Sequence, residues 1–186
     1  MKITRLNPEG LALIELSVFG DERGFFVERF HEERFRAAGI STHFVQDNHS
    51  RSGPGVLRGL HYQVSPAQGK LVGVVRGTIL DVAVDIRPDS PSFGQNYTTE
   101  LSDMNGRLLW IPAGFAHGFC VLGDSPADVL YKIDGFYNPN TEGGIRWDDP
   151  ELNIAWPIPN PIVSKRDKEQ PSFAQYRESA PKWKKS

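Results

Sequence analysis

The chain has 186 residues and a formal net charge of −2 at pH 7, so it lacks the basic surplus typical of proteins that bind nucleic acid non-specifically. Its one cysteine, Cys120, excludes an intramolecular disulfide, and its N-terminal stretch MKITRLNPEG has no apolar core of the kind that a signal peptide carries. No apolar run approaches the roughly 20 residues that cross a bilayer, so we expect a cytoplasmic protein without nucleic-acid or membrane partners.

Short apolar runs, punctuated by 14 prolines and 18 glycines, extend along the whole chain, which is typical of all-β proteins. The length suffices for one domain, and we predict a single domain over residues 1–186. The strands are predicted, in chain order, at Ala12–Phe19, Gly24–Phe30, Val56–Gln63, Lys70–Val75, Thr78–Arg87, Tyr97–Leu101, Arg107–Ile111, Gly118–Leu122 and Ala127–Tyr137.

A few short helices accompany these strands. The first is predicted over His31–Ala38, because its first turn contains Glu32 and Glu33 and Gly39 can end it. Another is predicted after Ser172, within a helical tail from about residue 164 to residue 186 whose basic end, KWKKS, is expected to be frayed. Many short antiparallel strands in one domain predict a sandwich or a jelly roll, and composition leaves both open.

The clearest strand is ILDVAVDIR, at residues 79–87. Its branched apolar residues at 82, 84 and 86 point to one side of a strand, while Asp81, Ala83 and Asp85 point to the other.

Two stretches, Gly55–Gln68 and Gly106–His117, have the glycine, proline and polar spacing of the two signature motifs of the cupin superfamily, which they resemble. The resemblance implies a double-stranded β-helix, a jelly-roll form of the all-β fold. Metal-binding cupins carry His, His, Glu and His at four motif positions, which here are His61, Gln63, Gln68 and His117. Because amides are poor ligands for a transition metal, we expect neither a metal nor another cofactor.

Six further blocks, in the same order along the chain, resemble the dTDP-4-dehydrorhamnose 3,5-epimerase family. The blocks are DERGFFVERF, QDNHSRSGPGVLRGLHYQ, QGKLVGVVRGTILDVAVDIRPDSPSFG, LLWIPAGFAHGF, GFYNPNTEGGIRWDDPELNIAWP and SKRD. They run from about Asp21 to Asp167, and several blocks in order carry far more weight than any one of them. The resemblance implies an enzyme of dTDP-L-rhamnose biosynthesis that converts a dTDP-4-keto-6-deoxyhexose, dTDP-4-dehydro-6-deoxy-D-glucose, into dTDP-4-dehydro-L-rhamnose.

This implied reaction inverts C3 and C5, which flank the C4 ketone and therefore carry removable protons if the enolate is stabilised. By resemblance, His61 is the base, Asp167 is the carboxylate behind it, Tyr131 is the proton donor, and Lys70 is the cation near the ketone oxygen. Each residue taken alone also has a structural reading. His61 and Tyr131 would be core residues, Asp167 a helix or turn cap, and Lys70 a strand-edge lysine.

The resemblance also implies substrate-binding residues. His117 would hydrogen-bond the sugar or its oxyanion, Arg58 and Arg23 would bind the diphosphate, and Tyr137 would stack on thymine. Further contacts with the substrate are implied for Phe26, Glu28, Gln46, Asp47, Asn48 and Glu142.

The geometry at two of the binding positions, Arg58 and Arg166, does not follow directly from the resemblance. Arg58 and His61 are three residues apart and would face opposite ways on a regular strand, so both reach the site only if Gly59 allows a bulge. Arg166 stands where the family's SEKD motif has lysine, and arginine is not equivalent to lysine at close contacts, so the contact from this position is open.

The resemblance implies a homodimer in which strands within about residues 1–30 cross to the partner, and the RGFF block completes the partner's site. Three other readings stay open at this point. The chain could be a metal-dependent cupin oxygenase or isomerase that uses His61 and His117. It could be a sugar-nucleotide-binding module without activity, or an epimerase that inverts only C3 or only C5 in another dTDP-deoxysugar pathway.

Overall fold

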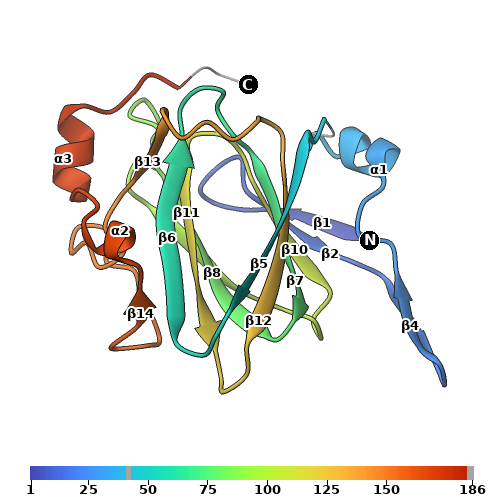
Figure 1. The fold of residues 1–186 in the computed structure, drawn as a ribbon. Helices are drawn as coiled ribbons and strands as arrows, with labels where there is room; N and C mark the ends of the chain where they lie inside the picture. The colour runs from blue at the N-terminus through green and yellow to red at the C-terminus, as the bar shows by residue number, and fades with distance from the viewer. Residues whose placement is uncertain (41–42, 184–186) are drawn as a thin grey trace.

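The computed structural model describes residues 1–40 and 43–183, and most of its strands belong to two packed β-sheets (Figure 1). The first sheet has the strand order β1-β2-β10-β7-β12-β5, and its neighbouring strands are antiparallel. Its strands are β1 (Lys2–Arg5), β2 (Ala12–Glu15), β10 (Arg107–Ile111), β7 (Lys70–Arg76), β12 (Ala127–Ile133) and β5 (Gln46–Ser52).

The second sheet has the order β13-β6-β11-β8-β9, and β14 adds to it by pairing in parallel with β6. Its strands are β13 (Glu142–Gly144), β6 (Val56–Gln63), β11 (Phe115–Leu122), β8 (Thr78–Asp85), β9 (Asn96–Ser102) and β14 (Ile162–Val163). Apart from the pairs β1–β2 and β8–β9, neighbouring strands of these two sheets are not consecutive in sequence, as in a jelly roll. The predicted all-β, cupin-like jelly roll is confirmed.

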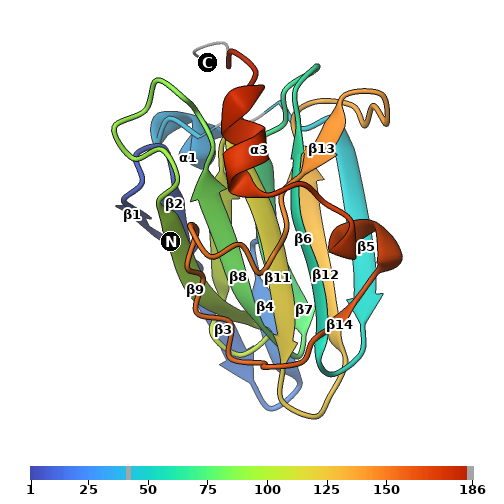
Figure 2. The same ribbon diagram turned by 90° about the vertical axis from the view of Figure 1, so that its left-hand side faces the viewer.

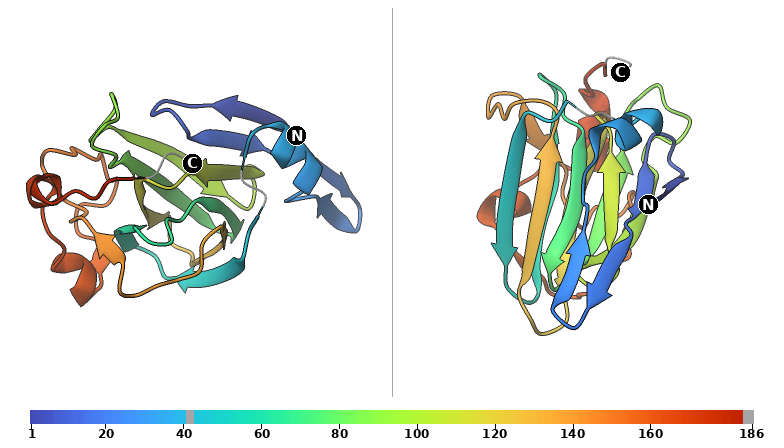
Figure 3. Two further views of the ribbon diagram at one scale, coloured as in Figure 1. Left: turned by 90° about the horizontal axis from the view of Figure 1, so that it is seen from above. Right: turned by 90° about the vertical axis from the view of Figure 1, so that its right-hand side faces the viewer.

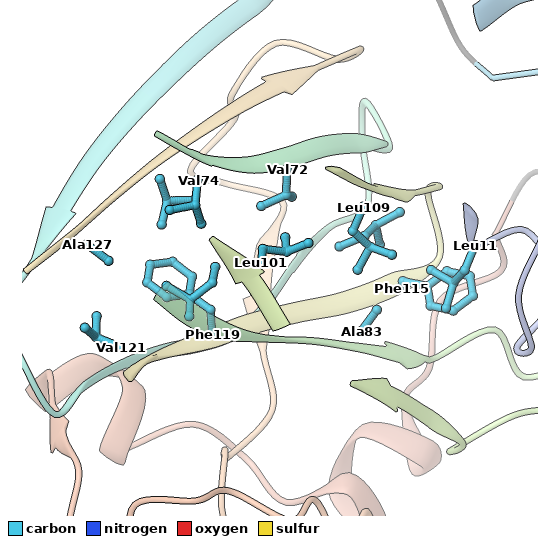
Figure 4. Packing of buried hydrophobic residues seen from close by; sticks show 13 residues of the cluster. Leu11, Val72, Val74, Ala83, Leu101, Leu109, Phe115, Phe119, Val121 and Ala127 are labelled. Carbon is cyan, nitrogen blue, oxygen red and sulfur yellow. The ribbon is translucent and has the colours of Figure 1, made fainter. Parts of the chain in front are cut away.

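Apolar side chains from both sheets fill the space between them (Figure 4). Val72 and Leu109 enter from the first sheet, and Ala83 and Phe119 enter from the second. All four are at most 5% exposed. This central cluster fixes the separation of the sheets, and the polar cavity described below opens beside it, lined by residues of both sheets.

Three short helices accompany the sheets (Figure 2). Helix α1 (Glu32–Ala37) buries Phe35 in a cluster with residues of the first sheet, and Gly39 follows it at φ +66°, as predicted. Helix α3 (Phe173–Glu178) begins after Ser172 with a capping box and packs against the second sheet. Helix α2 (Lys165–Lys168) is a single turn at the start of the C-terminal segment that we expected to be helical.

The predicted strand Ala12–Phe19 is wrong in its extent, because the chain leaves the first sheet after β2. It re-forms as β3 (Val18–Asp21), which pairs only with β4 (Gly24–Val27). This hairpin projects from the body of the molecule (Figure 3), and the exposed fractions of Phe25 and Phe26 are 70% and 68%. A continuous apolar sequence cannot reveal such a break, since both parts look like strand.

Four strands, β1, β5, β13 and β14, fall outside the predicted set. Strand β5 has the polar sequence QDNHSRS because one face lines a cavity and the other is exposed. The expectation of a frayed end is wrong as far as Trp183, whose indole Nε1–H donates to the Ile86 carbonyl over 3.2 Å; residues 184–186 lie outside the described residues. None of the described helices is long and apolar enough to cross a membrane.

Candidate active site

A bulge in β6 aims Arg58 and His61 into one cavity. Opposite them, the register of β11 shifts between His117, which faces His61, and Phe119, which faces Arg58. Gly59 lies at this shift with φ +123°, and a Cβ there would be 2.6 Å from the Cα of Gly118. The bulge required by the sequence is therefore present, and two glycines packed against each other permit it.

The cavity has a volume of about 630 Å³ and is lined by residues of both sheets and of α2. Most of the sequence-predicted site residues meet in it, although they come from strands β5, β6, β7, β11, β12 and β13, from the loop before β13 and from helix α2. These are Gln46, Asn48, Arg58, His61, Lys70, His117, Tyr131, Tyr137, Glu142, Arg166 and Asp167.

His61 and Asp167 form a hydrogen-bonded pair, with 2.7 Å between imidazole Nε2 and carboxylate Oδ1. Asp167 is buried in α2, where its backbone N–H donates to the capping hydroxyl of Ser164. Its second carboxylate oxygen accepts the Gly59 N–H, a donor in the bulge, at 3.2 Å.

Burial alone would raise the pKa of Asp167, but the hydrogen bond from His61, the charge of His61 and the Gly59 N–H together lower it below its ordinary value. The carboxylate is therefore ionised at neutral pH and can only accept. The proton of a neutral His61 ring must then be on Nε2, which leaves Nδ1 free to accept a proton.

A second pair lies beside the first. His117 Nε2 is 2.9 Å from Oδ2 of Asp81, a residue of β8 that is completely buried. Oδ1 of this aspartate is also buried and has no hydrogen-bond partner among the described residues. Sequence reasoning placed Asp81 on the polar face of ILDVAVDIR but gave it no role, although a charge within such an apolar strand was the available signal.

Lys70 and Tyr131 complete the group of ionisable residues in the cavity. The Lys70 ammonium donates to the His61 carbonyl oxygen at 3.4 Å. Desolvation lowers its pKa to about 8, against the opposing influence of the Glu142 and Asp81 charges. Desolvation also raises the pKa of Tyr131. At pH 7 the cavity therefore holds a cation and a protonated phenol next to the His61–Asp167 pair.

The rim of the cavity carries a hydrogen-bonded group of three side chains. The Tyr137 hydroxyl donates to Glu142 Oε2 over 2.8 Å, and Arg166 Nη2 lies 2.7 Å from the same oxygen. Burial would raise the pKa of Glu142, but hydrogen bonds from Arg166 and Tyr137 lower it. The arginine that replaces the expected lysine is thus engaged with a carboxylate on the rim.

Side chains along β5 point alternately to opposite faces, so its three predicted site residues do not all face the cavity. Gln46 and Asn48 line the cavity and are linked by a hydrogen bond of 2.9 Å. Asp47 is on the opposite face, where it forms an ion pair with Lys132. Arg58 lines the cavity from β6 while its Nε–H donates to Ser52.

The other predicted residues, Arg23, Phe26 and Glu28, do not line this cavity. Arg23 pairs with Asp21 at the tip of the β3–β4 hairpin, and Glu28 pairs with Arg34 of α1. Within one chain the structure therefore keeps these three residues apart from the other predicted site residues.

The two amides at cupin metal-ligand positions are bonded elsewhere. Gln63 uses both its nitrogen and its oxygen on backbone groups, and the Gln68 nitrogen donates to the Gly135 carbonyl. Within residues 1–40 and 43–183, no group of three or more His, Cys, Asp or Glu side chains is arranged to hold a metal ion. The donor set present does not fit the metal-dependent cupin reading.

Comparison with known proteins finds extensive similarity. The family model described as dTDP-4-dehydrorhamnose 3,5-epimerase matches residues 5–175. The chain is 53% identical over 169 residues to the dTDP-4-dehydrorhamnose 3,5-epimerase of Shigella flexneri, covering 90% of this chain and 93% of that protein. It is 39% identical over 181 residues to the dTDP-4-dehydrorhamnose 3-epimerase of Streptomyces niveus, covering 96% and 87%.

A solved structure extends the similarity to the whole fold. The crystal structure of dTDP-6-deoxy-D-glucose-3,5-epimerase from Legionella pneumophila Philadelphia 1, in complex with dTDP-4-keto-L-rhamnose, superposes with a TM-score of 0.94 at 44% identity. The alignment covers 100% of this chain and 99% of that chain.

Proposed function

The chain belongs to the dTDP-4-dehydrorhamnose 3,5-epimerase family, and from that membership we infer that it is an isomerase that inverts C3 and C5 of dTDP-4-dehydro-6-deoxy-D-glucose in dTDP-L-rhamnose biosynthesis. The observation that supports this reaction is that one cavity contains the His61–Asp167 pair, Tyr131 and Lys70. These residues can supply a base, a proton donor and a cation, which are the groups that epimerisation next to a ketone needs.

We assign proton abstraction to His61. Its Nδ1 takes the proton from C3 or C5, and the electrons of the broken C–H bond move into the enolate with its charge on the C4 oxygen. Asp167 keeps the other ring nitrogen protonated and stabilises the imidazolium that forms. Tyr131 returns a proton to the opposite face of the same carbon, because its phenol is protonated at neutral pH.

The developing charge on the C4 oxygen needs a donor or a cation. Lys70 supplies the cation from its partly desolvated position, and His117, held by Asp81, supplies a hydrogen bond to the sugar. Arg58 binds the diphosphate, while Gln46, Asn48, Glu142 and Arg166 contact the substrate around it. Tyr137 stacks on thymine at the rim.

We also propose that the enzyme is a homodimer whose β3–β4 hairpin completes the site of the partner subunit with Arg23, Phe26 and Glu28. The hairpin exposes several large apolar side chains, an arrangement that a second copy would cover. Strands within about residues 1–30 would lie at this interface. Asp47, which does not enter the cavity of its own chain, faces outward with its ion-pair partner Lys132.

Mixing two inactive variants tests the shared site. If Arg23 acts in the partner's cavity, R23A and H61A chains that exchange subunits form hybrid dimers with one intact site, and about a quarter of all sites become active. A monomer with full activity in dilute sedimentation experiments, or no recovery after verified subunit exchange, would refute the proposal.

The reaction itself is tested with dTDP-4-keto-6-deoxyglucose in deuterium oxide, with NMR used to count exchanged and inverted carbons. Deuterium and inversion at both C3 and C5 are expected. Inversion at one carbon would assign the chain to the single-carbon class represented by the Streptomyces niveus relative. Binding without exchange would leave only a sugar-nucleotide-binding module. Treatment with EDTA should leave the rate unchanged.

We also propose that the enzyme acts in the cytoplasm. Cys120 is buried and unpaired, which suits the reducing cytoplasm where we expect the enzyme to act.

A further inference from the structure

A loop at residues 134–141 connects β12 to β13 and carries Tyr137 on the cavity rim. Its central residues lie outside the strands, so their backbone groups need other hydrogen-bond partners. Gln63, at the end of β6 and 3% exposed, supplies two such bonds and makes a third to Pro66, in the connection between β6 and β7. Its Nε2 donates to the carbonyls of Phe136 (2.9 Å) and Pro66 (2.7 Å), and its Oε1 accepts the Asn138 N–H (2.7 Å).

One amide thus holds the backbone on both sides of Tyr137. Two other glutamines hold the residues between and before these points. Gln68 donates to the Gly135 carbonyl at 2.9 Å, and Gln46 accepts the Tyr137 N–H at 3.4 Å. Gln63 is the most buried of the three glutamines and is the one that bonds the loop at two points, so its loss should release the loop most.

The Tyr137 ring depends on this backbone for its place. Tyr137 is 51% exposed, and its hydroxyl donates to Glu142 at one end. A ring packed in a core is held from all sides, whereas a half-exposed ring keeps its orientation mainly through the backbone that carries it. Movement of residues 136–138 would therefore move the stacking surface.

We propose that Gln63 is a positioning residue for nucleotide binding, whose amide fixes the loop so that the Tyr137 ring is ready to stack on the thymine base. The inference rests on the proposed function, in which Tyr137 contacts that base. It also explains why a position that carries histidine in metal-binding cupins carries an amide here. The side chain donates two hydrogen bonds and accepts one. An amide can do this, whereas a neutral imidazole has a single N–H donor.

The test is Gln63→Glu, which is nearly isosteric. The carboxylate can still accept the Asn138 N–H but presents oxygen to the carbonyls of Pro66 and Phe136. We expect the inhibition constant of dTDP and the KM of the nucleotide sugar to rise roughly ten-fold, the size of a lost base stack, with kcat changed by less than about three-fold. Inhibition by pyrophosphate, which has no base, should not change.

Asn96→Asp is the matched control. Its amide nitrogen donates to the Leu152 carbonyl at 2.8 Å on a strand that does not line the cavity, so the same chemical change is made away from the loop. All constants should stay at the parent values. If Gln63→Glu is unfolded by circular dichroism, Gln63→Met replaces it, because it removes the hydrogen bonds without adding a charge.

A double-mutant cycle with Tyr137→Ala decides the mechanism. If Gln63 acts through the ring, Gln63→Glu has no further effect on dTDP inhibition in the Tyr137→Ala background. Additive effects, or equal weakening of dTDP and pyrophosphate, would overturn the inference. A parent enzyme that neither epimerises the substrate nor binds dTDP would instead refute the proposed function.

Discussion

The two histidine–aspartate pairs of the cavity have the same chemistry but different surroundings. His61 and His117 are register partners on adjacent strands, and each meets its aspartate through Nε2, at 2.7 Å and 2.9 Å. The side chain of His61 is 27% exposed, whereas that of His117 is 10% exposed. Asp167 uses both carboxylate oxygens, but Asp81 has a buried oxygen without a hydrogen bond.

This difference separates two tasks. A base must present a free ring nitrogen to the substrate and later exchange its proton, so it needs access and a partner that fixes its tautomer. The His61–Asp167 pair has both. The deeper His117–Asp81 pair is better suited to hold a hydrogen bond in place than to pass protons to solvent. Sequence motifs alone do not distinguish the two histidines in this way.

Removing each imidazole should give the largest contrast. His61→Ala should lower kcat by roughly 10²–10⁴-fold, the usual contribution of a general base, and should abolish deuterium exchange because no enolate forms. His117→Ala should retain exchange and lose less activity. Turnover and exchange measured by NMR on both variants provide the check. Loss of exchange in His117→Ala alone would reverse the assignment.

Tyr131→Phe should affect only the second half of the reaction. The enolate still forms at His61, which can return a solvent-derived proton to the face it came from. We expect exchange at C3 or C5 with retained configuration, and inversion slowed by roughly 10²-fold. Folding should change little, because the substitution removes only a hydroxyl and leaves no large cavity. Inversion of both carbons at the parent rate would show that another acid serves that face.

The matched pair Asp167→Asn and Asp81→Asn compares the two carboxylates directly. Asp167→Asn leaves the imidazole in place but no longer fixes its tautomer, so proton abstraction should slow by roughly ten-fold or more, though less than in His61→Ala. Asp81→Asn should slow exchange less. Initial exchange rates in deuterium oxide give the comparison. Equal, small effects would point to structural roles for both residues.

Some elements of the fold could be predicted from the sequence, and others could not. Alternation and turn residues predicted β6, β8 and both helix starts, because those signals are local. The bulge at Gly59 followed from a geometric demand, since Arg58 and His61 could not otherwise share a face. The break between β2 and β3 was missed because apolar character continues across it, and β5 was missed because its polar face lines a cavity.

The prediction of the site residues depended more strongly on the family resemblance than the prediction of the fold did. His61 and Asp167 are 106 positions apart, and no periodicity brings them together. Ser164 at an N-cap would predict only a helix start, in which Asp167 is an ordinary first-turn acid. Asp81 belongs to a strand that was correctly predicted, yet its partner lies on another strand whose register the sequence does not contain.

The smallest effect concerns Lys70, which lies close to both pairs. Its pKa is lowered to about 8 by desolvation, so the ammonium is charged at pH 7 and neutral above that value. If the cation stabilises the enolate, kcat/KM should fall about two-fold by pH 8 and about ten-fold per further pH unit. The pKa of Tyr131 is raised above its ordinary value of about 10, so deprotonation of this phenol does not explain such a fall. Lys70→Arg keeps its charge throughout this range, and its profile should lack the decline near pH 8 even if its maximal rate is lower. A decline near pH 8 that persists in Lys70→Arg would assign it to another group and leave the lysine without an electrostatic role.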